Sequence, residues 1–375
     1  MNLLHISPRL SPGGINQLAA DMAVGLQQAG FRNTVISPPN ELVGRMAASS
    51  VQHQNMRSLS LFNYRAQIRR IGRIMRSTRS DLILTYTTQA TYLAWMACKN
   101  LPEDERPRLI GIHTTYPRLR GWMLSLECCD ALVATSRHLR DELIRRASLD
   151  ADRHIWIVPY GVNEELCNPS YTPSATWLEQ WKRSYPQNTP TLNICLAGAI
   201  SPLHGHEDLP DILQKLNEAG VNARVFIAGD TARAKQRYLA KIQKLFKTRG
   251  ISRQVIWLGN RSDLRDVLCA SDVVISLTRQ PACHDRAILE ALSLGKPVAG
   301  YDHGIVGELL DIYLPEGRVE PGDTAGIADR LEQWNAYRPV LEGSLLRPYR
   351  LADTIRGIAE LCTSVCQGRN TAPNH

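Results

Sequence analysis

Glu290 is the carboxylate that the sequence most directly associates with ligand binding. It lies in residues 271–308, where an apolar run over 273–277 leads through a proline-containing loop into a helical pattern. Residues 298–301 predict another strand, and a glycine-spaced loop over 303–308 follows it. In a doubly wound sheet, the loops at the carboxyl ends of the strands bind ligands. We therefore expect Glu290, at the start of the helix, to contact a ligand.

Histidines supply further candidate chemistry. His113 ends a predicted strand, and His204 and His206 share a loop with two acids, Glu207 and Asp208. A His-x-His pair alone is a poor predictor of a metal site, so a polar loop is the favoured interpretation and no metal site is expected. The chain also has no G-x-S-x-G motif, which marks the nucleophile elbow of serine hydrolases.

The size and composition of the chain indicate a globular protein of two domains. Its 375 residues exceed one ordinary core, and 43% apolar with 21% charged residues is typical of globular proteins. No apolar run reaches the length of a membrane span, and the N-terminus lacks the features of a signal peptide, so we expect a cytoplasmic location. Nine cysteines without a C-x-x-C pair favour reduced thiols.

Positive charge is concentrated in the first half of the sequence. Residues 1–170 hold 20 Lys and Arg against 14 Asp and Glu, which gives +6 of the net +8. Within this half, an acid-free segment carries arginine at positions 57, 65, 69, 70, 73, 76 and 79. A basic amphipathic helix suits an anionic membrane surface or an acidic substrate, and the alternative is a solvated helix face. Nucleic acid is disfavoured as a partner, because aromatic residues are only 6% and no stacking platform is apparent.

Strand and helix patterns alternate along the whole chain. Strands are predicted in the first half at 2–7, 34–37, 81–85, 108–113, 131–135 and 155–161. Strands are predicted in the second half at 192–198, 223–228, 255–258, 273–277 and 298–301. This alternation predicts two α/β domains with doubly wound parallel sheets, 1–168 and 169–348, and a helical tail, 349–375, that packs back on the first domain.

Four segments of the chain, 11–14, 158–163, 198–205 and 283–308, follow one another as they do in a known family. With these segments the chain resembles the GT-B glycosyltransferases of family 4, particularly bacterial members that build lipopolysaccharide and other envelope glycans. The resemblance covers nearly the whole chain and is most specific over 286–308.

The resemblance implies a fold and an activity. The fold is GT-B, in which two Rossmann-like domains face a cleft. The activity is a retaining transfer of a hexose or heptose from a nucleotide-sugar donor on the second domain to a glycan or glycolipid acceptor on the first. No cofactor and no metal are implied, and the protein would lie at the inner face of the cytoplasmic membrane.

The resemblance also implies roles for single residues. Gly13 and Gly14 match the family's glycine loop, where the backbone approaches donor phosphate or acceptor closely. His113 matches the histidine beside the reacting sugar, and a structural histidine is the alternative. Glu290 matches the second glutamate of the family's glutamate pair, which holds the donor ribose, and Arg286 matches the pattern around it.

Further donor and acceptor residues follow from the same resemblance. Gly304, Ile305 and Val306 match the late phosphate loop, and His204 stands where the family has a lysine that neutralises the donor diphosphate. The residues expected at the surface for the acceptor or an anionic membrane are Arg69, Arg70, Arg73 and Arg118.

The chain departs from the family pattern in the donor site. Ala282 replaces the first glutamate of the pair, Ala199 replaces the diphosphate arginine, and Ile305 replaces a glycine. Losing one preorganised partner of the leaving group costs about two to three orders of magnitude in rate. Two hypotheses follow. The first is an active transferase with a rearranged donor site. The second is a catalytically degenerate relative that serves as a binding, scaffold or regulatory subunit. The side chains that could substitute for the lost cations are His204, His206, His284 and Arg279.

Overall fold

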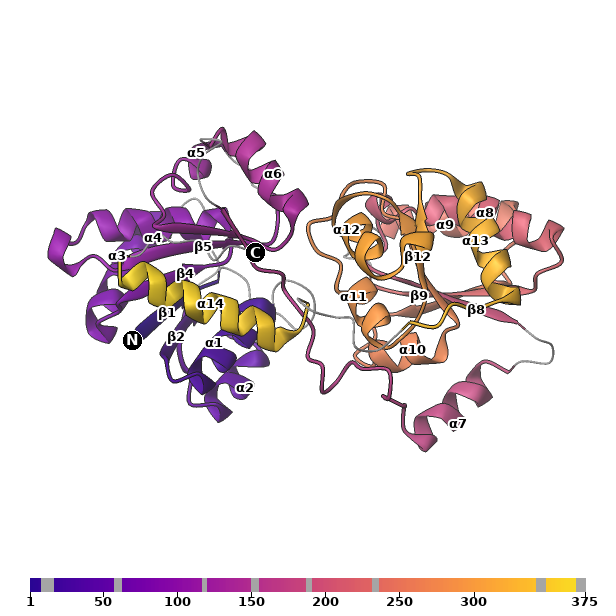
Figure 1. Ribbon diagram of the computed structural model, residues 1–375, viewed down its shortest axis with the longest axis horizontal. Helices are drawn as coiled ribbons and strands as arrows, with labels where there is room; N and C mark the ends of the chain where they lie inside the picture. Colours follow the sequence, from indigo (N-terminus) through magenta and orange to yellow (C-terminus); the bar gives the residue numbers. More distant parts are fainter. Residues whose placement is uncertain are drawn as a thin grey trace. The chain divides into compact units, whose positions relative to one another are not determined.

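Two parallel β-sheets flanked by helices organise the chain (Figure 1). The structure, a computed structural model, describes residues 1–7, 17–56, 63–116, 120–149, 155–186, 191–230, 236–341 and 349–368. It divides into two units, of which unit 1 is Met1–Gly161 with Pro348–His375 and unit 2 is Val162–Arg347. Unit 2 therefore begins slightly before residue 169, where the sequence places the second domain.

Unit 1 contains a seven-stranded parallel sheet in the order β3-β2-β1-β4-β5-β6-β7. Its strands are β1 (Asn2–Ile6), β2 (Arg32–Ser37), β3 (Gln52–Asn55), β4 (Leu82–Thr85), β5 (Arg108–His113), β6 (Ala131–Ala134) and β7 (Ile155–Ile157). Its helices are α1 (Leu18–Gln28), α2 (Leu42–Ala48), α3 (Tyr64–Thr78), α4 (Thr88–Lys99), α5 (Arg120–Met123), α6 (Arg137–Ala147) and α14 (Leu351–Cys366).

The sequence patterns missed α2 and the edge strand β3 of this unit. The four residues of β3 are all polar, and most are exposed. An edge strand that pairs on one side and faces water carries no apolar signal, because neither of its faces is buried in the core.

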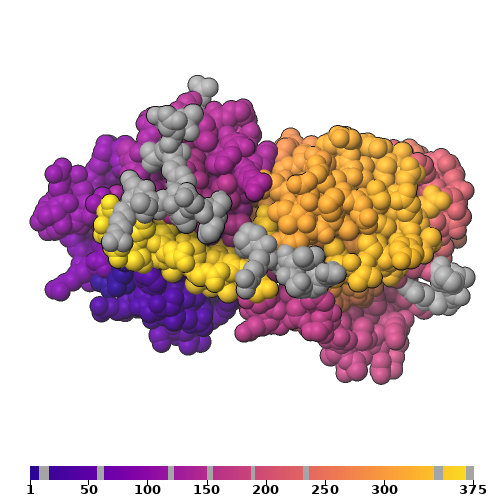
Figure 2. All heavy atoms as spheres, in the orientation of Figure 1, coloured from indigo at the N-terminus to yellow at the C-terminus, as the bar shows by residue number. Residues whose placement is uncertain are grey.

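Helix α14 packs on unit 1, although it follows unit 2 in the sequence. Its residues Ile358, Leu361 and Cys362 are buried in one cluster with α1 and β1. Figure 2 shows this yellow helix lying across the indigo and purple residues of unit 1. The chain enters the helix beside Gly161, whose N–H donates to Thr354 Oγ1 at 2.9 Å.

Unit 2 contains a six-stranded parallel sheet in the order β10-β9-β8-β11-β12-β13. Its strands are β8 (Leu192–Ala197), β9 (Ala223–Ala228), β10 (Val255–Gly259), β11 (Val273–Ser276), β12 (Val298–Tyr301) and β13 (Arg318–Val319). Its helices are α7 (Ala175–Ser184), α8 (Leu209–Glu218), α9 (Gln236–Thr248), α10 (Leu264–Ala270), α11 (Arg286–Ser293), α12 (Gly304–Tyr313) and α13 (Thr324–Ala336). The two doubly wound parallel-sheet units confirm the predicted fold class.

Two local predictions in unit 2 are wrong. The glycine-spaced segment 303–308 is the first part of α12 and not a loop, because Ile305, Val306 and Leu309 repeat at helical spacing and are buried. Glu290 lies in the second turn of α11 and not at its first residue. None of the described helices is both long and apolar enough to cross a membrane.

The contact at Gly161 predicts a strong effect of a single methyl group. A Cβ at Gly161 would lie 2.3 Å from the carbonyl carbon of Arg350 and 2.4 Å from the carbonyl oxygen of Tyr349. Because these are backbone atoms, Gly161→Ala has to displace the start of α14, and we expect it to lower the free energy of unfolding by about 3 kcal/mol. Urea unfolding followed by circular dichroism measures the change.

Gly72→Ala is the matched control for that substitution. Gly72 lies inside α3, and its Cβ would meet no atom within 4 Å. We expect this variant to be more stable than the wild type by about 0.5 to 1 kcal/mol, because alanine favours helix. Equal stability of the two variants would contradict the packing described for α14.

Candidate functional site

The carboxyl edge of β8 and β11 is the candidate site of unit 2. β8 pairs with β9 on one side and with β11 on the other, so the order of the strands reverses between β8 and β11. Ligands of doubly wound sheets bind outside the carboxyl ends of the strands at such a reversal. The chain segments at this edge are the loops after β8 and β11 and the starts of α11 and α12.

The loops after β8 and β11 are held tightly against each other. Gly205 adopts φ +66°, and a Cβ there would lie 1.9 Å from the carbonyl oxygen of Leu277. Only glycine permits this approach. The backbone N–H of Arg279 donates to the carbonyl oxygen of Leu203 at 2.9 Å, which fixes the same pair of loops. The sequence therefore determines the shape of this edge through Gly205.

Arg279, the main cation of these loops, is paired with two carboxylates. Its guanidinium donates to Glu207 Oε2 at 2.9 Å and to Asp208 Oδ1. Asp208 is buried and also accepts from Tyr301 Oη at 2.8 Å, while Lys241 Nζ donates to Glu207 at 2.7 Å. The two cations and two acids balance each other, so Arg279 adds little net positive charge to the edge. The sequence analysis singled out Arg279 but missed that Asp208 holds it.

The two histidines of the loop after β8 have different environments. His204 is half-buried, and its Nδ1 lies 2.8 Å from Ser201 Oγ. His206 is 1% exposed, and burial, aided by the nearby His204, lowers its pKa to about 4. His206 is therefore a neutral packing residue at pH 7 and does not replace a lost cation. His204 is the histidine of this pair that a ligand can reach.

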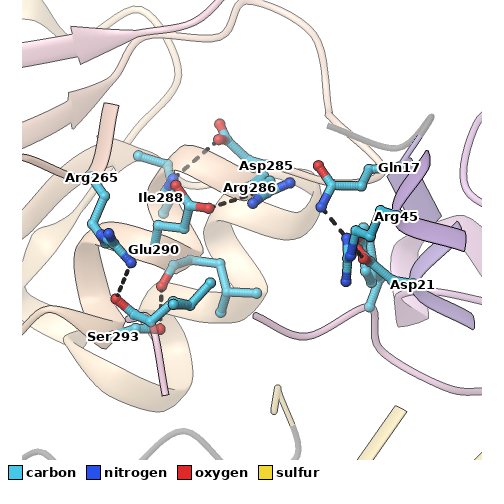
Figure 3. Close-up of polar contacts among 12 residues, drawn as sticks. Gln17, Asp21, Arg45, Arg265, Asp285, Arg286, Ile288, Glu290 and Ser293 are labelled. Atoms are coloured by element: carbon cyan, nitrogen blue, oxygen red, sulfur yellow. Dashed lines mark hydrogen bonds and ion pairs between the residues drawn. The ribbon is translucent and has the colours of Figure 1, made fainter. Parts of the chain in front are cut away.

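Helix α11 carries Glu290 and Arg286 and begins at a buried carboxylate. Asp285 caps the helix by accepting from the backbone N–H of Ile288 at 3.2 Å, and burial raises its pKa to about 6. Arg286 Nε donates to Glu290 Oε1 at 2.6 Å across one helical turn, as Figure 3 shows. The sequence analysis missed Asp285, although an Asp directly before a helical pattern is an N-cap signal.

Glu290 is less accessible than its predicted ribose contact requires. The residue is 6% exposed, and its carboxylate is paired with Arg286, whose side chain is 33% exposed. A ligand reaches the Glu290 carboxylate only if Arg286 moves aside or shares it. The structure thus brings the two predicted residues together, but as partners of each other.

Gly304, Ile305 and Val306 at the start of α12 offer backbone groups rather than side chains to a ligand. Gly304 has φ +57°, and a Cβ there would lie 2.6 Å from the carbonyl oxygen of Ala282. That oxygen also accepts from the N–H of Ile305 at 2.9 Å. The side chains of Ile305 and Val306 are buried in the core. Ala282 stands where the family has a glutamate. Its carbonyl oxygen bonds to the N–H of Ile305, which is one of the groups expected to bind phosphate.

His113 ends β5 of unit 1 and is completely enclosed. It is 1% exposed, burial lowers its pKa to about 4, and its Nε2 has no hydrogen-bond partner. Thr114 Oγ1 beside it and Thr135 Oγ1 after β6 are also buried without partners. Such unsatisfied groups are few in native proteins and call for an explanation, such as a ligand or water. The carboxyl edge of β5 and β6 is therefore the candidate site of unit 1.

A buried acid of unit 1 escaped the sequence analysis. Asp21 on α1 accepts from Tyr160 Oη at 2.7 Å, Arg45 Nη1 at 2.6 Å and Gln17 Nε2 at 3.4 Å (Figure 3). Tyr160 follows Asp21 by 139 positions, and no local pattern announces such a contact. The network joins α1 to Tyr160, which directly precedes the end of the first segment of unit 1 at Gly161.

The arginines of α3 lie on an amphipathic helix, as the spacing predicts. Arg69 and Arg73 are exposed and Arg70 is half-buried, while the opposite side buries Ile71 and Ile74. These three arginines have no ion pair within the described residues. The helix therefore presents uncompensated positive charge to solvent.

Three predicted residues, Gly13, Gly14 and Arg118, lie outside the described residues. Within the described part of the chain, no three His, Cys, Asp or Glu side chains gather as a metal site would require.

Two family models match the chain in succession. The model described as Glycosyltransferase Family 4 matches residues 12–166, and the model described as Glycosyl transferases group 1 matches residues 179–338. Their boundary falls near that of the two units. No curated protein sequence matches the chain significantly.

Solved structures share the fold of the whole chain. A glycosyltransferase from Rickettsia africae is 20% identical with a TM-score of 0.81, and the match covers 99% of both chains. HepE of Anabaena, solved in complex with UDP and glucose, is 17% identical with a TM-score of 0.74 over 98% of both chains. The lipopolysaccharide outer core galactosyltransferase WaaB is 13% identical with a TM-score of 0.71, over 97% of this chain and 100% of that one.

The buried histidines of unit 1 predict sensitivity to acid. Burial lowers the pKa of both His5 and His113 from 6.5 to about 4. Below pH 6.5 the unfolded chain therefore binds protons that the folded chain does not, so stability is full above pH 6.5 and falls toward pH 4. One pKa unit corresponds to about 1.4 kcal/mol, so each histidine costs about 3 kcal/mol by pH 4.

Urea unfolding of the wild type and of His113→Gln between pH 7.5 and 4 measures this loss. We expect the variant to lose less stability than the wild type across this range, because one of the two groups no longer titrates. An identical pH dependence in both proteins would show that His113 is not the buried neutral group described here.

Proposed function

Because the chain belongs to the GT4-type GT-B glycosyltransferases, we propose that it moves a sugar, with retention of configuration, from a nucleotide sugar to an envelope glycan or lipid-linked acceptor. The donor binds unit 2 and the acceptor binds unit 1. The observation that carries the proposal is the placement of Glu290, Arg286 and the start of α12 at the strand reversal of unit 2.

The donor is a nucleoside diphosphate sugar held at this edge. Its diphosphate lies at the N-terminal end of α12, where backbone N–H groups and the helix dipole favour an anion. Its ribose hydroxyls donate to Glu290, which then exchanges part of its contact with Arg286 for the ligand. HepE binds UDP and glucose in its structure, so uridine diphosphate sugars are the first donors to test.

The leaving diphosphate needs positive charge when the bond to the sugar breaks. Ala199 supplies none, and Arg279 is already paired with Glu207 and Asp208. The charge comes from Arg286, which shares Glu290 with the donor, and from His204 when it is protonated. Each such group stabilises the transition state by about 3 to 4 kcal/mol in comparable sites.

The acceptor site belongs to unit 1. His113 at the end of β5 and Thr114 after it are 1% exposed and carry polar atoms without a partner, so an acceptor hydroxyl or the reacting sugar would satisfy them only when this edge opens. The uncompensated arginines of α3 hold the protein at an anionic membrane surface, where lipid-linked acceptors are found. WaaB, which shares the fold, is a lipopolysaccharide galactosyltransferase, so the lipopolysaccharide core is the acceptor class we propose.

A second candidate function is that of a catalytically degenerate subunit. The observation that favours it is that the groups at the donor edge already bond to the protein itself. The N–H of Ile305 donates to the carbonyl oxygen of Ala282, Arg279 is paired with acids, and Glu290 is buried. Under this alternative the protein uses the GT-B fold to bind a partner or a ligand without turnover.

Thermal stability with a panel of nucleoside diphosphates and their sugars separates the two functions. A ligand at a hundred times its Kd stabilises the folded state by about 2.7 kcal/mol, so we expect a higher Tm with one base and slow hydrolysis of the matching sugar. We expect Glu290→Gln to bind that ligand about 10 to 100 times more weakly, because a charge-assisted hydrogen bond is lost.

Glu332→Gln is the control, since Glu332 is an exposed acid on α13 of the same unit. It leaves the Tm shift unchanged. Absence of a shift with every nucleotide would overturn the transferase proposal, whereas a shift without any hydrolysis or transfer would favour the degenerate subunit.

Restoring a permanent charge at position 204 tests the account of the leaving group. In His204→Lys, a permanent cation replaces the half-buried imidazole of His204. We expect nucleoside diphosphates to bind about tenfold more tightly at pH 8, with a steeper dependence on salt, and nucleosides without phosphate to bind as before. Calorimetric titration measures both ligands, and an equal gain for the nucleoside would contradict a phosphate contact.

A further inference from the structure

Helix α9 of unit 2 carries a second row of exposed cations. Arg237, Lys241, Lys244 and Lys247 are exposed and recur at helical spacing, while Ile242 and Phe246 on the other side are buried. Over the ten positions from the first cation to the last, the row extends for about 15 Å. The α9 basic face, as we call these four residues, is therefore a straight positive stripe.

Few of these charges are neutralised by the protein itself. Lys241 pairs with Glu207 at 2.7 Å, whereas Arg237, Lys244 and Lys247 have no ion pair within the described residues. This differs from the rest of the described unit 2, where most cations reach an acid or a carbonyl oxygen. Examples are the pairs formed by Arg183, Lys215, Arg261, Arg318 and Arg338.

The sequence contains this row of cations, although a comparison of the net charge of the two halves does not reveal it. Between Asp230 and Asp263 there are nine Lys and Arg and no acid. Elsewhere the second half is rich in acids, so its total looks nearly neutral. The prediction that positive charge is concentrated in the first half is therefore incomplete.

The shape of the stripe decides between classes of anionic partner. A row of about 15 Å on one exposed helix suits an extended anionic surface better than a single small anion. Helix α9 exposes no large apolar or aromatic side chain that could stack on bases, which disfavours single-stranded nucleic acid. The same pattern recurs on α3 of unit 1, for which a membrane contact is proposed above.

We propose that the α9 basic face is a second contact of this protein with an anionic phospholipid bilayer, made by unit 2 independently of α3. The proposal deepens the membrane association of the proposed function and rests on it. The contact is electrostatic, because only cations and small or polar residues are exposed on this face. It holds unit 2 at the lipid surface through α9, which Lys241 joins to the loop that carries Glu207.

Flotation of the full chain with lipid vesicles tests this contact. The vesicles are phosphatidylcholine alone or an equal mixture of phosphatidylcholine and phosphatidylglycerol, each at low and high salt. The variant replaces three cations, Arg237→Gln, Lys244→Gln and Lys247→Gln, and retains Lys241 because it holds Glu207. Each Lys or Arg at an anionic bilayer strengthens binding about fivefold, so we expect about a hundredfold weaker binding to the mixed vesicles.

Two further variants make the result specific. The control carries Arg183→Gln, Lys215→Gln and Arg338→Gln, which remove the same net charge from paired, surface positions of unit 2. It binds the mixed vesicles within about threefold of the wild type, since these cations are neutralised by their own acids. Arg69→Gln, Arg70→Gln and Arg73→Gln remove the charge of α3 and report on the membrane contact of the proposed function.

The outcomes separate the two membrane contacts. If only the α3 variant loses binding and the α9 variant equals the control, this inference is overturned and the proposed function stands. If the wild type does not bind mixed vesicles although nucleotides raise its Tm, both membrane contacts are overturned and the transferase proposal remains. Tighter binding of a polynucleotide than of vesicles, lost in the α9 variant alone, would also overturn the bilayer as partner.

Discussion

The reversal of strand order between β8 and β11 is the constraint on which the candidate site of unit 2 depends. Because connections leave these two parallel strands in opposite directions, their carboxyl ends remain open to a ligand. The close approach of Gly205 to Leu277 fixes the two loops at this opening, and α11 and α12 begin beside them. The residues that could bind a donor therefore share one edge although they are far apart in the sequence.

The arginines at this edge of unit 2 are paired with acids of the protein itself. Arg279 is held by Glu207 and Asp208, and Arg286 is held by Glu290. A buried charge that loses its partner is costly, so these pairs keep the edge stable without a ligand. Under the proposed function a donor exchanges partners with these pairs, and opening them lowers its affinity.

The sequence predicted the fold well because buried parallel strands and helices leave strong periodic signals. It did not predict the edge strand β3, whose residues are polar and mostly exposed. It also predicted a loop at the start of α12, because the glycines there resemble a turn. The sequence also places Glu290 and Arg286 on one helix after β11, where the structure has them, and their role in donor binding stays a prediction. Their pairing, and the contact of Tyr301 with Asp208 across 93 positions, depend on the folded chain and have no local pattern.

A crystal structure of the full chain with a nucleoside diphosphate tests the central claim most directly. The account predicts that the ribose hydroxyls contact Glu290, that the diphosphate lies at the N-terminal end of α12, and that Arg286 shares Glu290 with the donor. A nucleotide bound elsewhere, or bound without a contact to Glu290, would contradict it.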